Sequence, residues 1–350
     1  MIHSHILENS DQALGRAGDH LIGSVRGLEP GPTLILLGGI HGNEPAGVLA
    51  CRRVLPLLEE KQSAIRGDVV FLVGNTRALQ KGLRYVDEDL NRHWTADSVR
   101  RVGAFRVRTS ESLERQELLA QLEKVLTSVR GEVHFVDLHT TSASGNPFAT
   151  VGDTLRNRRF AMNFPTTIIL GLEEQIDGTL LEYLNNLGAL TMGFEAAQHV
   201  ADSSVAHHEA VIWMAIIAAR NLRAEDVPEL SRPRATLARA SGGVSIVEVR
   251  HRHPIQAEDR FRMEPGFANF QRVKQGQPLA RDRRGQITAR ESGMVLLPLY
   301  QPLGDDGFFL GRKVWPFWLK LSAILRRMRV GDYVHWLPGV RQDPGNDMNL

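Results

Sequence analysis

The chain has 350 residues, of which 42% are hydrophobic and 23% are charged, and its formal net charge is +2. This length can bury a large core in one or two domains, and the near-neutral charge gives no case for a nucleic-acid or membrane-surface partner, despite local basic runs such as residues 250–253. The single cysteine, Cys51, excludes an internal disulfide and a thiolate metal site.

Between about residues 30 and 225, short apolar runs alternate with helical patterns. The predicted strands are Thr33–Leu37, Val69–Val73, Val133–Asp137, Thr166–Leu170 and Ala189–Phe194. The predicted helices are Pro45–Glu60, Leu113–Ser128, Ile176–Leu187 and Ser203–Leu222. Such alternation predicts an α/β fold with a mainly parallel or mixed sheet flanked by helices on both faces. In sheets of this kind, functional sites form beyond the carboxyl ends of the strands.

The pattern changes at residues 228–234, a stretch with two prolines that we interpret as a linker. The chain beyond it reads as short β segments separated by glycines. These are Gly243–Val249, Gly266–Val273, Gly276–Ala280, Gln286–Ala289 and Gly293–Leu299, followed by a predicted amphipathic helix at Trp315–Arg329. We therefore expect an α/β domain over residues 1–230 and a smaller β-rich domain over residues 235–350, which ends in a helix and caps the functional site.

Two histidines and a glutamate stand at the ends of two predicted strands. His41 and Glu44 follow the first strand, and His139 follows the third. Two imidazoles and one carboxylate are the ligand set of a catalytic zinc site with a free fourth position, whereas structural sites more often have four ligands. A lone histidine beside a strand is usually an ordinary polar group, but the second histidine favours one Zn²⁺ per chain. Asp137 could orient a ligand imidazole, unless its side chain points across the strand.

Two further polar features have two readings each. The segment Arg84–Arg92, with the sequence RYVDEDLNR, is either a solvated loop or a clamp in which guanidinium and amide groups bind a carboxylate and a carbonyl. Its sequence alone favours neither. Glu195, at the end of an apolar run, is either a surface residue or a general base beside a metal.

In this order, the motifs HGNE, RYVDEDLNR, DLHTTSASG and the strand-end Glu195 resemble the succinylglutamate desuccinylase/aspartoacylase family over about residues 30–200. The resemblance implies a zinc-carboxypeptidase-like fold and a zinc-dependent amidohydrolase that deacylates a small N-acyl amino acid, cleaving a linear amide. It implies these roles: His41, Glu44 and His139 bind zinc, Arg84 polarises the scissile carbonyl, Asn91 and Arg92 bind a substrate carboxylate, and Glu195 activates water.

The chain departs from the family pattern in its substrate-binding residues. Where the family has a substrate-binding tyrosine, the loosely matching stretch Asp306–Phe309 has aromatic residues without a hydroxyl. A further substrate-binding arginine has only Arg156, Arg158 and Arg159 as candidates. The stretch Phe194–His199 replaces the usual glutamate-glycine sequence. Zinc chemistry is therefore better supported than any particular acyl group or amino acid.

Two other functions fit the same residues. A metallocarboxypeptidase acting on peptides could use the same zinc set and base, but it needs an open groove. A non-catalytic zinc- or ligand-binding member would keep the site without turnover. No signal-peptide pattern or membrane-spanning segment is apparent, so we expect a cytoplasmic protein. The sequence leaves open whether the protein is a monomer or a homo-oligomer.

Overall fold

The strands that carry the predicted motifs belong to one large mixed sheet. The computed structural model describes residues 14–100, 109–199 and 201–315. The large sheet contains β1 (Leu21–Arg26), β2 (Glu29–Gly38), β3 (Arg66–Val73), β4 (Val133–Thr141), β5 (Phe148–Val151), β6 (Thr167–Leu170), β7 (Leu190–Gln198), β8 (Ile246–Pro254), β10 (Arg272–Val273), β13 (Gly293–Leu296) and β14 (Asp306–Lys313). A small sheet contains β9 (Arg262–Met263), β11 (Pro278–Asp282) and β12 (Gly285–Thr288). The helices are α3 (Ala46–Glu59), α4 (Thr76–Lys81), α5 (Ala96–Arg100), α6 (Ser110–Thr127), α7 (Leu155–Ala161), α8 (Leu180–Asn186), α9 (Ser203–Ala218) and α10 (Ser231–Ser241).

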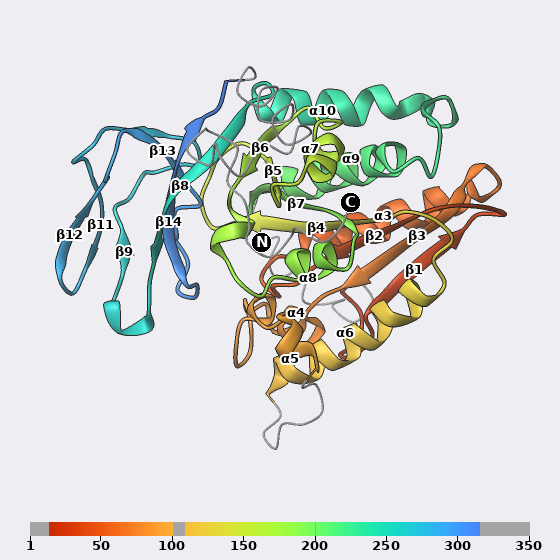
Figure 1. Cartoon of the computed structure of the whole chain (residues 1–350), viewed down its shortest axis with the longest axis horizontal. Coiled ribbons are helices and arrows are strands. Elements are labelled where there is room, and N and C mark those ends of the chain that lie inside the picture. The colour runs from red at the N-terminus through yellow and green to blue at the C-terminus, as the bar shows by residue number, and fades with distance from the viewer. Residues whose placement is uncertain (1–13, 101–108, 200, 316–350) are drawn as a thin grey trace, which may run out of the picture.

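The large sheet forms the middle of a three-layer arrangement. Its strand order is β1-β3-β2-β4-β7-β5-β6-β8-β14-β13-β10. β2 is parallel to β3 and β4, β4 is parallel to β7, and β5 runs antiparallel to β7. Helices α3, α7, α9 and α10 pack on one face, and α6 and α8 pack on the other (Figure 1). The predicted α/β fold with a mixed sheet flanked by helices is therefore confirmed.

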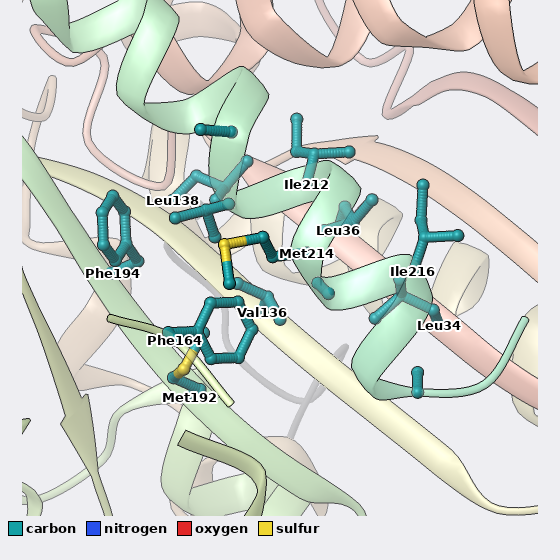
Figure 2. Packing of buried hydrophobic residues seen from close by; sticks show 14 of the residues in the cluster. Leu34, Leu36, Val136, Leu138, Phe164, Met192, Phe194, Ile212, Met214 and Ile216 are labelled. Carbon is teal, nitrogen blue, oxygen red and sulfur yellow. The ribbon is translucent and has the colours of Figure 1, made fainter. Parts of the chain in front are cut away.

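Alternate side chains of the central strands enter opposite layers. In β2, Leu34 and Leu36 belong to the cluster on the α9 side, whereas Ile35 belongs to the cluster on the α6 side. Figure 2 shows Leu34 and Leu36 on the sheet near Ile212 and Ile216 of α9. This period of two follows from the pleat of the strand, and it explains why a strand covered on both faces is apolar at every position.

Replacing Leu36 by alanine should destabilise the fold by about 2–5 kcal/mol, because it removes fully buried methyl groups and leaves a cavity. The measurement is the free energy of unfolding in urea. Leu57→Ala is the control, since Leu57 lies on α3 with 48% of its surface exposed and should change stability by no more than about 0.5 kcal/mol. An equal loss of unfolding free energy in both variants would contradict the packing of Leu36 in the core.

All five strands predicted before residue 225 are confirmed, but several helix boundaries differ. The helix predicted from Ile176 begins only at Leu180, because Gly178, in a left-handed conformation with φ of +74°, precedes it. The helix predicted to Leu222 ends at Ala218, just before Arg220 adopts a φ of +68°. The stretch interpreted as a linker contains the start of α10 instead. Its second proline is compatible with this, since a proline in the first helical turn removes no intrahelical hydrogen bond.

The C-terminal region continues the large sheet. β8 pairs in parallel with β6, and β14 pairs antiparallel with β8. Of the predicted C-terminal segments, Gly266–Val273 contains only the two-residue strand β10, while β14 was not predicted. The helix predicted at Trp315–Arg329 lies outside the described residues from residue 316 onward. A domain boundary near residue 230 stays a prediction.

Within the described part of the chain, no helix is both long and apolar enough to cross a membrane.

Cys51 is fully buried in α3, and burial raises the pKa of its thiol, as expected for a packing residue rather than a nucleophile.

Candidate active site

A glycine-rich turn after β2 carries His41 and Glu44 to the carboxyl end of the sheet. Gly39 has a φ of +70°, a left-handed conformation that favours glycine. A Cβ atom on Gly42 would lie 2.1 Å from the backbone carbon of Ala78, so the turn can approach α4 only because this residue is glycine. The turn thus places both side chains above the sheet edge.

The pairing of β4 with β7 brings His139 and Glu195 side by side. These two residues are partners in the parallel register. The sequence pattern predicts strand ends just before both residues, whereas β4 and β7 continue past them. The ring centroids of His139 and His41 lie 5.2 Å apart, so β2, β4 and β7 converge on one point.

The two histidines and Glu44 form a compact set of metal donors. Nδ1 of His41 lies 3.1 Å from Oε1 of Glu44, and Nδ1 of His139 lies 3.2 Å from Oε2. Ligand atoms of the three residues all lie within 4.8 Å of one another, and all three side chains are buried. The N–H group of Thr140 donates to Glu44 at 2.9 Å and fixes the carboxylate. Two imidazole nitrogens and a carboxylate are a donor set that suits zinc.

The outer nitrogens of both imidazoles face a second carboxylate. Nε2 of His41 lies 3.3 Å from Asp89, and Nε2 of His139 lies 3.0 Å from Asp137. A neutral imidazole has only one N–H group, so a ring between two carboxylates needs a second proton or a metal ion. Burial would lower the pKa of His139, but Asp137 and Glu44 raise it well above its usual value. These residues therefore fit a cation between the Nδ1 atoms and Glu44, with Asp89 and Asp137 orienting the rings.

Asp89 is a site residue that the sequence did not identify. It accepts hydrogen bonds from Arg84 Nε at 3.2 Å and Nη2 at 2.9 Å, besides its contact with His41. Arg84 Nη1 also lies 3.8 Å from Glu44. Burial would raise the pKa of Asp89, but Arg84 and His41 hold it well below its usual value. Asp89 thus fixes the Arg84 guanidinium beside the metal donors.

Glu195 has the environment expected of a general base. Its Oε2 atom is buried and has no hydrogen-bond partner among the described residues. Burial raises the pKa of its carboxyl group to about 8. An acid–base group works best when its pKa lies near the working pH. The carboxyl group lines the same pocket as His41, Glu44 and His139.

Asn91 and Arg92 also line this pocket, and protein groups hold both side chains. The side-chain amide oxygen Oδ1 of Asn91 accepts a hydrogen bond from Leu180 N at 2.9 Å, so its Nδ2 group is the atom that could donate to a ligand. Arg92 donates through Nη1 to the backbone carbonyl oxygen of Asn91 and through Nη2 to Asp306 at 3.3 Å, and its Nε lies 3.6 Å from Asp305. Each terminal nitrogen carries two N–H groups, so each has one left for a ligand.

The pocket has a volume of about 140 Å³, and C-terminal residues form one of its walls. Leu297, Pro298, Leu299, Gln301, Gly304, Asp305, Asp306 and Phe309 contribute to this wall. His199 connects it to the metal donors, because its ring lies 2.7 Å from the Thr140 hydroxyl and 3.1 Å from the Gln301 amide oxygen. In the sequence, His199 stands out only as the end of the stretch that departs from the family pattern. Gln301 and the pocket carboxyl group Glu173 were both missed.

Several sequence candidates lie elsewhere. None of the three candidate arginines, Arg156, Arg158 and Arg159, lines the pocket. Arg156 contacts Glu132, and Arg158 contacts Asp153. These arginines are therefore not the missing substrate-binding group.

A second group of potential metal ligands contains His20, Glu114 and Glu117. Here Arg77 Nη1 lies 2.6 Å from Glu114 and 2.7 Å from Glu117, so a guanidinium already forms ion pairs with both carboxylates. We therefore assign this group to structural support of α4 and α6.

Comparison with known proteins shows which family the sequence matches and which solved structures share its fold. The model of the succinylglutamate desuccinylase/aspartoacylase catalytic domain matches residues 30–212. A succinylglutamate desuccinylase from Shewanella pealeana is 32% identical over 116 residues, which are 33% of this chain and 33% of that protein. The matched stretch thus spans about a third of the curated relative's length.

Solved structures extend the likeness over most of the fold. A succinylglutamate desuccinylase/aspartoacylase from Rhodobacter sphaeroides has a TM-score of 0.61 at 19% identity, covering 83% of this chain and 88% of that chain. The succinylglutamate desuccinylase from Chromobacterium violaceum has a TM-score of 0.56 at 15% identity, covering 83% of this chain and 86% of that chain. At these identities the likeness shows the fold alone.

Proposed function

The chain belongs to the succinylglutamate desuccinylase/aspartoacylase family, and on that premise we propose that it is a zinc-dependent amidohydrolase that removes the acyl group from a small N-acyl amino acid. One observation carries the proposal: the metal donors, Glu195 and Arg84 line one pocket. A metal, a base and a fixed guanidinium at one point are the components that amide hydrolysis needs.

His41, Glu44 and His139 would hold the zinc ion. When bound, zinc would act as a Lewis acid and lower the pKa of a coordinated water. Glu195 would take the proton of the attacking water and pass it to the leaving amine nitrogen. Arg84, held by Asp89, would donate to the carbonyl oxygen as negative charge develops there.

Asn91 and Arg92 would bind the carboxylate that every N-acyl amino acid carries beside its amide. The Arg92 guanidinium is already oriented by its contacts with Asp306 and the Asn91 carbonyl. A guanidinium fixed in this way can bind a carboxylate with little further loss of side-chain freedom.

A peptidase is the second candidate, and the pocket favours the deacylase. The wall of C-terminal residues on one side of the pocket suits a compact ligand better than the open groove that a peptidase needs. This favours the proposal that the C-terminal region caps the site. Amine release from N-acetyl and N-succinyl amino acids, compared with release from peptides, tests the proposal. Faster cleavage of peptides would overturn it, and no turnover of either class would favour a non-catalytic protein.

Replacing Arg92 by glutamine should raise KM roughly tenfold or more and change kcat less, because a charge-assisted contact to the substrate carboxylate is lost. The measurement compares an N-acetyl amino acid with its α-carboxamide analogue, and the variant should no longer distinguish them. The exposed Arg156→Gln variant is the control and should keep the wild-type KM. A loss of kcat at constant KM would contradict the assignment of Arg92 to carboxylate binding.

A further inference from the structure

The pocket contains one carboxyl group with no role in the proposed reaction. Glu173 follows β6 and lines the pocket together with Glu195. Of the other pocket carboxylates, Glu195 is assigned to the reaction, Glu44 faces the histidines, and Asp305 and Asp306 face Arg92. No basic side chain of the described residues lies within ion-pair distance of Glu173. His139 lowers the pKa of Glu173 only from a distance, so no ion pair occupies this carboxyl group.

Two threonine hydroxyls hold the Glu173 side chain in place. Thr150 on β5 donates to Oε1 at 3.4 Å, and Thr179 donates to Oε2 at 3.1 Å. Thr179 Oγ1 already accepts a hydrogen bond from Glu182 N, so its own proton is directed to Glu173. Two neutral donors fix the direction of the carboxylate but leave its charge uncompensated.

The surroundings of Glu173 suit an alkyl chain that ends in a cation. Leu172, Ile176, Leu181 and Phe309 line the same pocket and offer apolar contacts for methylene groups. Glu173 is enclosed by protein atoms but keeps a surface toward the pocket, and burial raises its pKa. A bound cation would favour the ionised form of Glu173. The cation would then interact with a carboxylate that little water surrounds, which strengthens their attraction.

This inference rests on the proposed deacylase function. We propose that Glu173 binds the side-chain ammonium group of the substrate, so that the enzyme prefers N-acyl amino acids with a short basic side chain. The Arg92 guanidinium and the Asn91 amide would bind the α-carboxylate of the same molecule. An acidic side chain directed at Glu173 would be repelled, so this residue would select against acidic amino acids.

A purely structural role is the alternative, since Glu173 also connects β5 to the start of α8 through Thr150 and Thr179. The two roles differ in their dependence on substrate charge. Loss of a structural link should reduce activity on every substrate by the same factor. Loss of an ammonium site should reduce activity only on cationic substrates.

The test compares zinc-loaded wild-type protein and Glu173→Gln on Nα-acetylornithine, N-acetylnorvaline and N-acetylglutamate. Ornithine and norvaline differ by one amino group, and glutamate has a carboxylate in place of the terminal aminomethyl group of ornithine. We expect the wild type to prefer acetylornithine, and Glu173→Gln to lose about ten- to a hundredfold in kcat/KM for it while changing little on acetylnorvaline. Glu174→Gln is the matched control, because Glu174 does not line the pocket. It should behave like the wild type.

Wild-type preference for acetylglutamate or acetylnorvaline would overturn the inference and leave the deacylase function intact. An equal loss on all substrates in Glu173→Gln would assign the residue to structure and overturn it as well. If no substrate is cleaved, the proposed function fails, and calorimetric binding of ornithine and norvaline then decides the inference. Tighter binding of ornithine, lost in Glu173→Gln, would support it, and equal binding would overturn it.

Discussion

Replacing Glu195 by glutamine should reduce kcat by roughly 10²–10⁴-fold, the usual contribution of a general base, while zinc content stays at about one ion per chain. Glutamine keeps the size of the side chain but cannot accept the proton of the attacking water. Glu195 lies beside His139 through the strand register without belonging to the donor set, so the metal should remain bound. Steady-state kinetics and elemental analysis of the same preparation provide the measurement.

Glu174→Gln is again a suitable control, since it makes the same chemical change outside the pocket. Retained activity in Glu195→Gln would mean that another group is the base. Loss of zinc together with activity would instead mean that Glu195 contributes to metal binding, and the kinetic result could not then assign its role.

Replacing His139 by alanine should remove the metal and with it all measurable deacylation. The substitution deletes one of three donors and leaves Glu44 and Asp137, on either side of the ring, as buried carboxylates without the imidazole between them. A chelator should inactivate the wild type in the same way, and added Zn²⁺ should restore the wild type but not the variant. Metal content and amine release are measured in parallel.

The second histidine–carboxylate group supplies the control for this experiment. Glu117→Gln changes a potential metal ligand that already forms an ion pair with Arg77, so metal content and activity should stay at the wild-type level. If Glu117→Gln loses one zinc ion per chain, the second group also binds metal. If His139→Ala keeps its zinc ion, the proposed centre is wrong.

The motif residues could be placed from the sequence because each comes after an unambiguous apolar run, even where the strand itself continues further. Strands buried on both faces, such as Thr33–Leu37, have no competing helical pattern, and their carboxyl ends meet at one edge of the sheet. His41, Glu44, His139 and Glu195 therefore came together as expected.

Residues whose roles depend on contacts between distant segments could not be placed. Asp89 reads as one of several acidic residues in a polar loop, and only the fold brings it between Arg84 and His41. Glu173 and Gln301 come from parts of the chain with no motif at all. Proline content at residues 228–234 indicated a linker, although a proline in a first helical turn is compatible with a helix.

Hydrogen bonds to the buried side chain of Glu111 hold the loop that carries Arg84 and Arg92. Glu111 on α6 accepts hydrogen bonds from the backbone N–H groups of Val86 at 2.7 Å, Asp87 at 3.0 Å and Glu88 at 3.3 Å. The backbone between the two arginines is thus ordered before any ligand arrives. The free energy of ligand binding then does not have to offset the conformational entropy lost when such a loop becomes ordered. More of the contact energy therefore remains as affinity.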